Sequence, residues 1–403
     1  MTNCRFCKGT KLHDFIDLGH MPPSNSFLTK EQLLEPEVYY PLKLFVCQDC
    51  WLVQIDEYKK AIEIFGDDYV YYSSYSPSWV QHAKDYVAMM CERFGYGEDS
   101  CILEIGSNDG YLLQWFNERG AVTLGIDPAR GPAEAARKRG VRTDPELFSA
   151  YKATDIFRCD LICGINVLAH QPDINDFVEG LRIALKPDGI VTMEFPHLMN
   201  LVDQCQFDTI YQEHYQYFSF NTVCKIFQAH GLQIFDVAEL PTHGGSLRIF
   251  AQHKDTGKYS LTWRVPELVN REIKKGMDEL SYYKGFQKKI NGIKRNLVEF
   301  LISSDCWEIA AYGAAAKGNT LLSYCGIRSD LLQFVVDRSP HKQGKYLPGS
   351  HIPVYDEDYL KKVQPDYVLI LPWNLKEEIV EQLSYIREWG GRFVIPIPEL
   401  EVI

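Results

Sequence analysis

Hydrophobic and polar positions change period along the chain in a way that predicts helices alternating with strands. Residues 79 to 94 carry apolar side chains at helical spacing, and the apolar run at 101 to 105 predicts a buried strand that ends in a glycine loop. Further strands are expected at 122–127, 161–163 and 190–195. Strands that alternate with helices at this spacing predict a doubly wound parallel sheet.

A second alternating region follows a long charged stretch. Residues 266–303 are periodic and charged, which predicts a linking helix. The strands expected after it are 308–312, 334–337, 367–371 and 392–395. A glycine-containing loop follows the first of these strands. The last hundred residues are therefore expected to form a smaller α/β domain.

Two cysteine pairs mark the N-terminal region. Cys4-x-x-Cys7 and Cys47-x-x-Cys50 lie about 40 residues apart. Four thiolates from two such pairs can close a tetrahedral shell around Zn²⁺, which leaves no coordination position for water or substrate. We therefore predict a structural zinc site that folds a segment with little core of its own. The alternative is two unrelated pairs, one of them redox-active.

The charge balance narrows the range of partners. The formal net charge is −12 at pH 7, whereas nucleic-acid binding needs clustered Lys and Arg. We expect no nucleic-acid partner, although a local basic pocket for a small anionic substrate stays open. The sequence shows no N-terminal signal and no apolar run of bilayer length, so we expect a cytoplasmic protein with no membrane partner. Its 12 cysteines are expected to stay reduced.

The segment from Glu104 to Gly110 follows an apolar strand and opens a helix, as a cofactor loop does. Gly106 and Gly110 let the backbone approach a ligand closely, and Asn108 lies between them. The segment lacks the Gly-x-Gly-x-x-Gly spacing of dinucleotide loops and the Gly-Lys-Ser/Thr of phosphate loops. Its Glu-x-Gly-x-x-x-Gly pattern resembles the first motif of class I methyltransferases, where the loop lies against the methionine part of S-adenosylmethionine.

The next strand ends in a second candidate cofactor residue. The carboxylate of Asp127 can accept hydrogen bonds from both ribose hydroxyls of an adenosine. The loop and this acid together predict cofactor binding. The alternative is an α/β domain without a cofactor that keeps its turn glycines.

Polar side chains follow two of the later strands. Asn166 and His170 come after the third predicted strand, and open α/β sheets place ligands at the carboxyl ends of their strands. Tyr211, Glu213 and His214 lie close together after the fourth, and such a group can supply a general base near neutral pH. The alternatives are a structural histidine at position 170 and a solvated helix face around position 213.

These motifs occur in one order, which resembles that of bacterial nucleotide-sugar C-methyltransferases. Those enzymes act on carbon 3 of 4-keto-deoxysugars. The order comprises the cysteine pairs, Tyr-Tyr-Ser-Ser-Tyr-Ser-Pro, Glu-Ile-Gly-Ser-Asn-Asp-Gly, Tyr-x-Glu-His and Tyr-Gly-Ala-Ala-Ala-Lys-Gly. The resemblance covers essentially the whole chain. It implies a zinc-binding domain at 1–75, an S-adenosylmethionine-binding methyltransferase domain at 76–265, a linking helix at 266–303 and a Rossmann-like sugar-nucleotide domain at 304–403.

The resemblance also implies catalytic roles. The Tyr-x-Glu-His motif falls on Tyr211, Glu213 and His214, with His214 as the base that removes the proton on carbon 3 of the sugar. Asn166 and His170 would contact the sugar near that carbon. Either a tyrosine hydroxyl or His170 would donate to the oxygen on carbon 4, because the developing enolate needs a donor.

A run of tyrosines at residues 69–75 contains the lid tyrosine that the resemblance implies. We assign Tyr72 to catalysis and Tyr75 to substrate contact. The alternative for the run is a packing seam between the zinc segment and the next domain. The segment His243 to Arg248, with two glycines, is a further expected pocket edge.

The loop from Gly313 to Gly318 is the expected site of the sugar nucleotide. Its small residues let backbone N–H groups approach a pyrophosphate, and Lys317 adds a positive charge. Asp337 ends the next strand and could contact a ribose. The alternative is close packing of strand on helix with a surface lysine.

Two other functions stay open. An O- or N-methyltransferase of another small molecule needs a weaker base, so replacement of His214 should then be tolerated. A zinc-ribbon binding protein with a degenerate methyltransferase core is opposed by the negative net charge. The sequence does not identify the nucleotide, the sugar or the oligomeric state, although the expected architecture permits a monomer.

Overall fold

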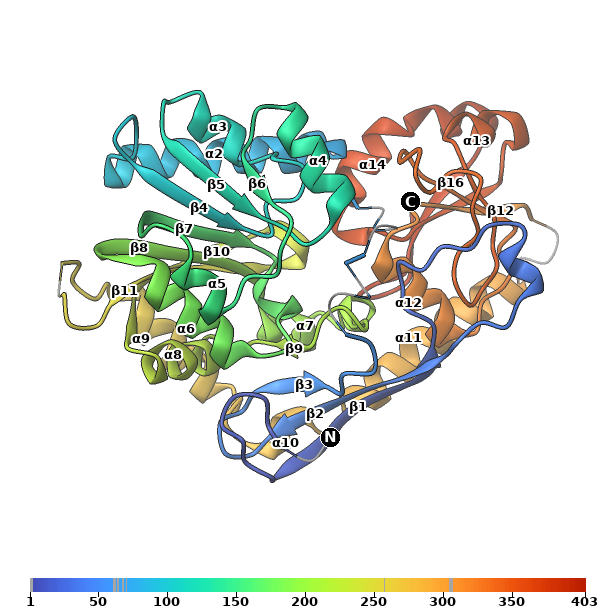
Figure 1. The fold of residues 1–403 in the computed structure, drawn as a ribbon. Coiled ribbons are helices and arrows are strands. Elements are labelled where there is room, and N and C mark those ends of the chain that lie inside the picture. The colour runs from blue at the N-terminus through green and yellow to red at the C-terminus, as the bar shows by residue number, and fades with distance from the viewer. Residues whose placement is uncertain are drawn as a thin grey trace. The chain divides into compact units, whose positions relative to one another are not determined.

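The computed structural model describes residues 3–60, 63, 65, 66, 69, 71–256, 258–303 and 307–403. These residues gather into two compact units, each assembled from separate stretches of the chain (Figure 1). Unit 1 consists of residues 1–13, 46–198 and 213–282. Unit 2 consists of residues 14–45, 199–212 and 283–403. Both units therefore draw on the N-terminal 75 residues and on the middle of the chain.

Unit 1 is built on a sheet in which seven strands of the described chain follow the order β10-β11-β8-β7-β4-β5-β6. The strands are β4 (Cys101–Ile105), β5 (Val122–Ile126), β6 (Thr143–Asp144), β7 (Cys159–Ile165), β8 (Leu185–Pro196), β10 (Leu232–Leu240) and β11 (Ser246–His253). Neighbouring strands from β6 to β8 are parallel, and β11 is antiparallel to β8 and β10. The predicted doubly wound core is confirmed.

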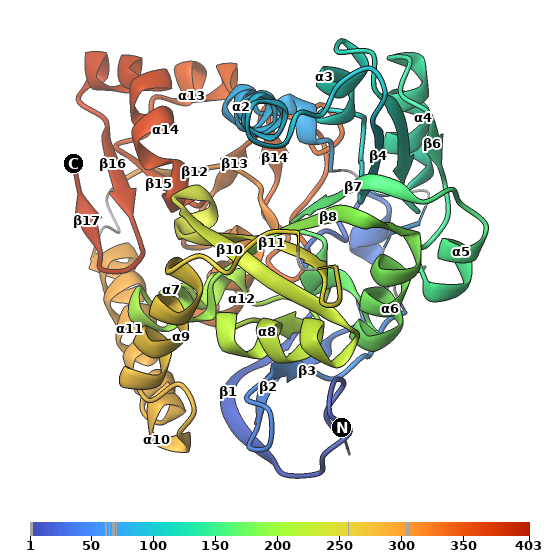
Figure 2. The same cartoon turned by 90° about the vertical axis from the view of Figure 1, so that its left-hand side faces the viewer.

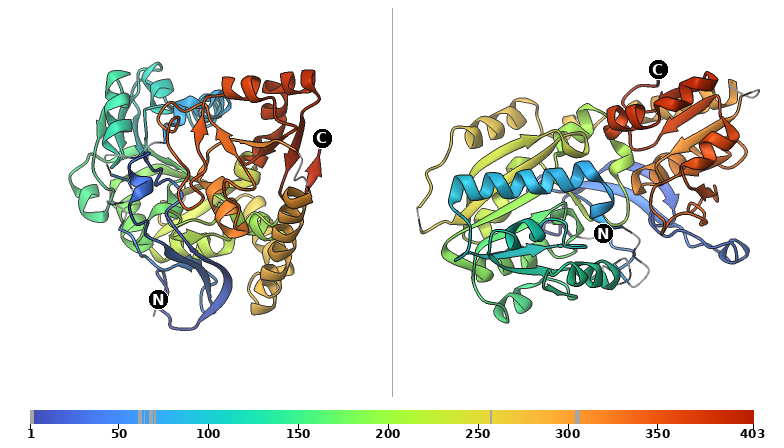
Figure 3. Two further views of the ribbon diagram at one scale, coloured as in Figure 1. Left: turned by 90° about the vertical axis from the view of Figure 1, so that its right-hand side faces the viewer. Right: turned by 90° about the horizontal axis from the view of Figure 1, so that it is seen from above.

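Helices cover both faces of this sheet because its strands are apolar on both sides. Figures 2 and 3 show helices such as α2 and α6 beside the strands of this sheet. Ile102 of β4 packs in one cluster with Tyr86 and Met90, while Leu103 packs in another with Phe177 and Phe227. The helices of unit 1 are α2 (Pro77–Phe94), α3 (Leu113–Asn117), α4 (Arg130–Lys138), α5 (Ala150–Thr154), α6 (Ile174–Ala184), α8 (Phe220–Ala229) and α9 (Arg264–Lys274). A short strand β3 (Val53–Ile55) pairs antiparallel with β9 (Gln216–Tyr217).

Unit 2 contains the smaller α/β arrangement that the sequence predicts. Its sheet has the order β14-β13-β12-β15-β16-β17, in which only the last pair is antiparallel among the strands described. The strands are β12 (Ile309–Tyr312), β13 (Phe334–Val336), β14 (Val354–Tyr355), β15 (Tyr367–Ile370), β16 (Arg392–Ile395) and β17 (Glu401–Val402). The helices are α12 (Ala316–Cys325), α13 (Asp358–Val363) and α14 (Lys376–Gln382). The strand order reverses between β12 and β15, which is where open sheets bind ligands.

Residues 266–303 form several helices instead of the single linking helix expected. They are α9, α10 (Leu280–Tyr283) and α11 (Phe286–Ser303). Gly276 and Gly285 separate them with φ values of +77° and +86°, a backbone conformation that a continuous helix cannot contain.

The remaining strands and α-helix of the described chain are β1 (Leu12–Met21), β2 (Tyr40–Cys47) and α7 (Leu198–Asp203). No helix of the described chain has both the length and the apolar character needed to cross a membrane.

Candidate cofactor and catalytic site

Four thiols meet where the sequence predicts a zinc site. The Sγ atoms of Cys4, Cys7, Cys47 and Cys50 all lie within 4.8 Å of one another. The Cys4–Cys50 and Cys7–Cys47 Sγ–Sγ distances are both 3.5 Å, close to the roughly 3.8 Å of a tetrahedral shell with Zn–S bonds of about 2.3 Å. The donor set therefore fits Zn²⁺ and offers it a closed, structural shell.

The predicted cofactor loop joins β4 to α3 in unit 1. Gly106 and Gly110 have φ values of +70° and +80°, and Asn108 between them has +47°. A Cβ at Gly110 would lie 2.9 Å from the side chain of Val141, so the turn depends on glycine for both conformation and space. The loop thus turns at the carboxyl end of β4, which is where open sheets of this kind bind ligands.

Two buried carboxyl groups flank this loop. Asp127 accepts the backbone N–H groups of Asn108 and Ala129 at 2.8 and 2.9 Å, and burial raises its pKa to about 6. Glu104 is fully buried, and neither of its carboxylate oxygens has a partner among the residues that the structure describes. Burial and then the neighbouring Asp127 raise the pKa of Glu104. Unpaired buried acceptors suit the donor-rich, cationic S-adenosylmethionine.

The tyrosine run is bound to the same loop. The backbone N–H of Ser73 donates to Oδ1 of Asn108 at 2.8 Å, and Asn108 Nδ2 donates to the carbonyl of Tyr71 at 3.1 Å. The rings of Tyr72 and Tyr75 stack with centroids 5.4 Å apart. Burial is the main cause of a raised pKa for Tyr72, so its hydroxyl keeps its proton and can donate.

Two predicted catalytic histidines meet in unit 1. The ring centroids of His170 and His214 are 4.7 Å apart, and Nδ1 of His170 donates to the carbonyl of Glu213 at 2.9 Å. Because a carbonyl accepts, the proton of neutral His170 lies on Nδ1, which leaves the lone pair on Nε2. Burial lowers the pKa of His170 to about 4. This histidine is therefore suited to accept a hydrogen bond near neutral pH, and the predicted donor role fits a tyrosine better.

The Tyr-x-Glu-His motif lies where the chain passes from one unit to the other. Tyr211 belongs to unit 2, whereas Glu213 and His214 belong to unit 1. In unit 2, Oγ1 of Thr320 donates to the carbonyl of Ile210 at 2.9 Å and so ties α12 to the residue before Tyr211. The structure thus brings His214 to His170, and it places the residue before Tyr211 against α12.

Asn166 has a partner that the sequence did not identify. Its side-chain Nδ2 lies 2.7 Å from Nε2 of His243. His243 belongs to the glycine-containing segment that the sequence singles out as a pocket edge, but no sequence pattern assigns a role to that histidine. The contact between Asn166 and His243 forms because β11 lies antiparallel beside β8. No local sequence pattern predicts that placement of β11.

The second glycine loop, in unit 2, leads into a helix that carries a lysine. Gly313 has φ +89°, and a Cβ there would lie 2.5 Å from Pro372. Nζ of Lys317 donates to Oδ1 of Asn374 at 2.5 Å and lies 5.2 Å above the ring of Trp373. Burial lowers the pKa of Lys317. Lys317 is half-buried and lies near the point where the strand order of the sheet reverses.

Two further acids surround this loop. Burial raises the pKa of Asp208 to about 6 against the opposing charge of Lys317, and Trp373 Nε1 donates to Asp208 at 2.7 Å. Asp337 accepts the backbone N–H of Ser339 at 2.8 Å and lies 3.4 Å from Nζ of Lys342. The predicted residues Gly313, Lys317 and Asp337 therefore lie in one unit at one end of its sheet.

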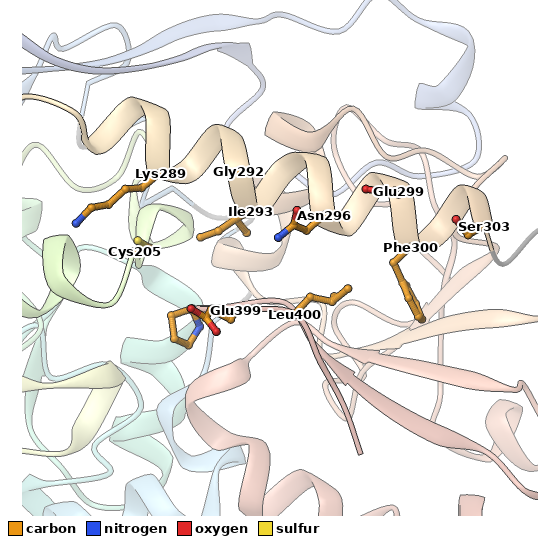
Figure 4. A pocket seen from close by; sticks show the side chains of 11 residues that line it. Cys205, Lys289, Gly292, Ile293, Asn296, Glu299, Phe300, Ser303, Glu399 and Leu400 are labelled. Carbon is orange, nitrogen blue, oxygen red and sulfur yellow. The ribbon is translucent and has the colours of Figure 1, made fainter.

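A separate pocket of about 940 Å³ lies elsewhere in unit 2, between α11 and residues 398–400 (Figure 4). Lys289, Glu299 and Glu399 are among its polar lining residues. None of the predicted site residues lines it. The pocket is therefore distinct from the two glycine loops.

Three family models match successive parts of the chain. Residues 4–65 match a family model for a zinc binding domain, residues 81–237 one for a methyltransferase domain, and residues 241–398 one for a C-methyltransferase C-terminal domain. The C-methyltransferase NovU of Streptomyces niveus is 35% identical over 406 residues, which cover 99% of this chain and 96% of that protein.

Two further similarities cover only part of the chain. A ubiquinone biosynthesis O-methyltransferase of Histophilus somni is 28% identical over 100 residues, or 22% of this chain and 42% of that protein. The crystal structure of an S-adenosylmethionine-dependent methyltransferase from Mesorhizobium loti is 15% identical, with a TM-score of 0.36, over 43% of this chain and 100% of that one.

Proposed function

Because the chain belongs to the family of S-adenosylmethionine-dependent C-methyltransferases that includes NovU, we propose that it methylates carbon 3 of a nucleotide-activated 4-keto-deoxysugar. The proposal assigns zinc binding to residues 1–75, cofactor binding to 76–265 and sugar-nucleotide binding to 304–403, joined by the helical segment 266–303. It rests above all on the pair of His170 and His214, whose rings lie 4.7 Å apart in the same unit as the cofactor loop.

Carbon methylation needs a base, which heteroatom methylation needs less. A proton beside a ketone becomes removable when a base is aligned with it and a donor stabilises the developing enolate oxygen. His214 is the proposed base. Glu213 lies next to it in the chain and would orient its imidazole or support its charge.

The donor to the oxygen on carbon 4 is assigned to Tyr72. Its hydroxyl retains its proton, whereas neutral His170 has its lone pair on Nε2. His170 would then accept a hydrogen bond from a sugar hydroxyl. Tyr75, which is 41% exposed, is assigned to contact with the substrate.

The cofactor residues fit S-adenosylmethionine, which when bound supplies a methyl group activated on a sulfonium. The backbone of Gly106 and Gly110 would lie against its methionine part, and Glu104 would face its positive charge. Asp127 would hold the ribose hydroxyls, since each of its oxygens has a further lone pair beyond the backbone N–H that it accepts. Zinc would remain structural and take no part in the reaction.

The C-terminal unit would bind the nucleotide. Lys317 and the backbone at the start of α12 would contact the pyrophosphate, and Asp337 a ribose. Lys317 would exchange its hydrogen bond to Asn374 for a phosphate oxygen. The proposed reaction needs only a single chain.

The proposal is tested by product mass after incubation with S-adenosylmethionine and a panel of nucleotide 4-keto-6-deoxysugars. We expect one methyl group to be added to at least one sugar, and His214→Ala to abolish the addition while cofactor binding persists. A panel with no methylated sugar and intact cofactor binding would overturn the substrate assignment. Full activity of His214→Ala would favour methylation of a heteroatom.

A further inference from the structure

We propose that His243 is a positioning residue that fixes the side-chain amide of Asn166, so that the amide oxygen is presented to the substrate. This inference rests on the proposed function, in which Asn166 contacts the sugar. The observation behind it is the 2.7 Å distance between Asn166 Nδ2 and His243 Nε2. Oδ1 of Asn166 is buried and has no hydrogen-bond partner in the described part of the chain.

The sheet brings these two residues together from opposite directions. Ile165, the last residue of β7, is paired with Glu194 of β8, and Ser246, the first of β11, is paired with Pro196. Since β11 is antiparallel to β8, its beginning lies at the edge where β7 ends. Asn166 and His243 therefore flank the carboxyl end of β8, which is the ligand-binding edge of this fold.

Backbone hydrogen bonds hold both residues at that edge. The N–H of Asn166 donates to the carbonyl of Glu194 at 2.9 Å. On the other side, the N–H of His197 donates to the carbonyl of Gly245 at 3.1 Å. The contact between the two side chains is thus anchored to β8 from both flanks.

Both residues adopt a left-handed backbone conformation, which is uncommon for residues other than glycine. Asn166 has φ +56° and His243 has φ +55°. Left-handed residues other than glycine cost free energy and cluster at functional sites. Two such residues joined side chain to side chain indicate a constellation that the surrounding structure maintains.

An aromatic side chain packs against the His243 imidazole and limits its motion. The ring of Trp79 meets it edge to face, with centroids 4.9 Å apart. Trp79 in turn stacks on His82 at 4.9 Å, and His82 Nε2 lies 2.8 Å from Oε2 of the buried Glu194. The imidazole therefore has a fixed neighbour on a helix, and its Nε2 stays directed at Asn166.

The chemistry of the pair determines which side of the amide faces the substrate. An amide nitrogen donates only, so Nε2 of His243 must accept and its ring proton lies on Nδ1. The amide oxygen is then left to accept a hydrogen bond from a hydroxyl of the sugar. Without an acceptor at position 243 the amide could turn, and its NH₂ would meet the hydroxyl in competition with its oxygen.

Kinetics of matched variants test this arrangement. We expect Asn166→Ala and His243→Phe each to raise KM for the sugar nucleotide about tenfold, the effect of one hydrogen bond, with a smaller change in kcat. The double variant should be no worse than either single one, because both remove the same interaction. His243→Gln, which keeps an acceptor, should restore most of the lost affinity.

A second histidine–asparagine pair provides the control. Nε2 of His230 lies 3.0 Å from Oδ1 of Asn175 in the same unit, away from the proposed site. His230→Phe should leave KM for the sugar nucleotide unchanged. Additive effects of Asn166→Ala and His243→Phe, or a His243→Gln variant as weak as His243→Phe, would overturn the proposal.

Nitrogen NMR of histidine-labelled protein tests the contact without turnover. We expect His243 to show a protonated Nδ1 and an accepting Nε2, and Asn166→Ala to shift the Nε2 signal. If the wild type methylates no sugar while this signal behaves as expected, the proposed function fails and the positioning contact stands. A proton on Nε2 in the wild type would overturn the proposal whatever the activity.

Discussion

The two glycine loops share one architecture and differ in charge. In unit 1, β4 leads through Gly106 and Gly110 into α3, and in unit 2, β12 leads through Gly313 into α12. The first loop lies among buried acids, whereas the second has a half-buried lysine in addition to the buried Asp208. The backbone geometry therefore provides a ligand platform in both, and the side chains decide which charge the ligand carries.

The acid at the end of the following strand sharpens this comparison. Asp127 and Asp337 each accept the backbone N–H of the residue two positions later, at 2.9 and 2.8 Å. Asp127 also accepts the N–H of Asn108 in its glycine loop, whereas Asp337 lies 3.4 Å from Nζ of Lys342. The same local motif therefore contacts the cofactor loop in unit 1, whereas in unit 2 it lies beside a lysine.

The largest effect is expected from replacing His214, the proposed base in unit 1. His214→Ala should lower kcat by about 10²–10⁴-fold, the usual contribution of a general base. Calorimetry should find S-adenosylmethionine binding unchanged. His230→Phe, a histidine change in the same unit, should leave kcat alone, and a loss of cofactor affinity in His214→Ala would contradict the role assigned to it.

Exchanging the two acids for amides should separate the two ligands. Asp127→Asn should weaken S-adenosylmethionine binding by roughly 10–100-fold, because hydrogen bonds to a charged group contribute about 1.5–3 kcal/mol. Asp337→Asn should spare the cofactor and weaken the sugar nucleotide. Titration of each variant with each ligand measures this, and equal losses for both ligands in either variant would break the comparison.

The two glycines give the same separation with a smaller effect. Gly110→Ala and Gly313→Ala would each force a Cβ into a left-handed residue, at a cost of about 1–2 kcal/mol. We expect roughly tenfold weaker cofactor binding in the first and roughly tenfold weaker sugar-nucleotide binding in the second. Gly140→Ala, with φ +81° and no atom within 4 Å of its Cβ, controls for strain alone.

The smallest effect concerns pH. The pKa of Asp127 is raised to about 6 by burial, so the carboxylate is ionised at pH 7 and becomes protonated as the pH falls through that value. S-adenosylmethionine affinity should therefore decrease by a few-fold between pH 7 and pH 5.5. Asp127→Asn should remove this part of the pH dependence, and an unchanged slope in that variant would assign it to another group such as Glu104.

Local patterns predicted the fold and the loops. The strand at 101–105 matches β4 in full, and the acid after the next strand lies against the glycine loop as expected. The two cysteine pairs meet in the structure, as the spacing of the two Cys-x-x-Cys motifs predicts. These features depend on contiguous residues, and a single sequence contains that information.

Long-range contacts could not be predicted. His243 meets Asn166 across a strand that lies between them in the sheet, and Asp208 meets Trp373 after a separation of 165 residues. The tautomer of His170 follows from its hydrogen bond to the Glu213 carbonyl, which no pattern reveals. The interrupted helix at 266–303 was misread because its charged periodicity outweighed Gly276 and Gly285.

The central claim is that the methyl group is transferred to carbon. Carbon NMR of the product made with ¹³C-methyl S-adenosylmethionine and a nucleotide 4-keto-6-deoxysugar tests this most directly. We expect a methyl resonance coupled to ring carbon 3, and no such product from His214→Ala. A methyl resonance in the region of methoxy or N-methyl groups would contradict the account and show that the acceptor is a heteroatom.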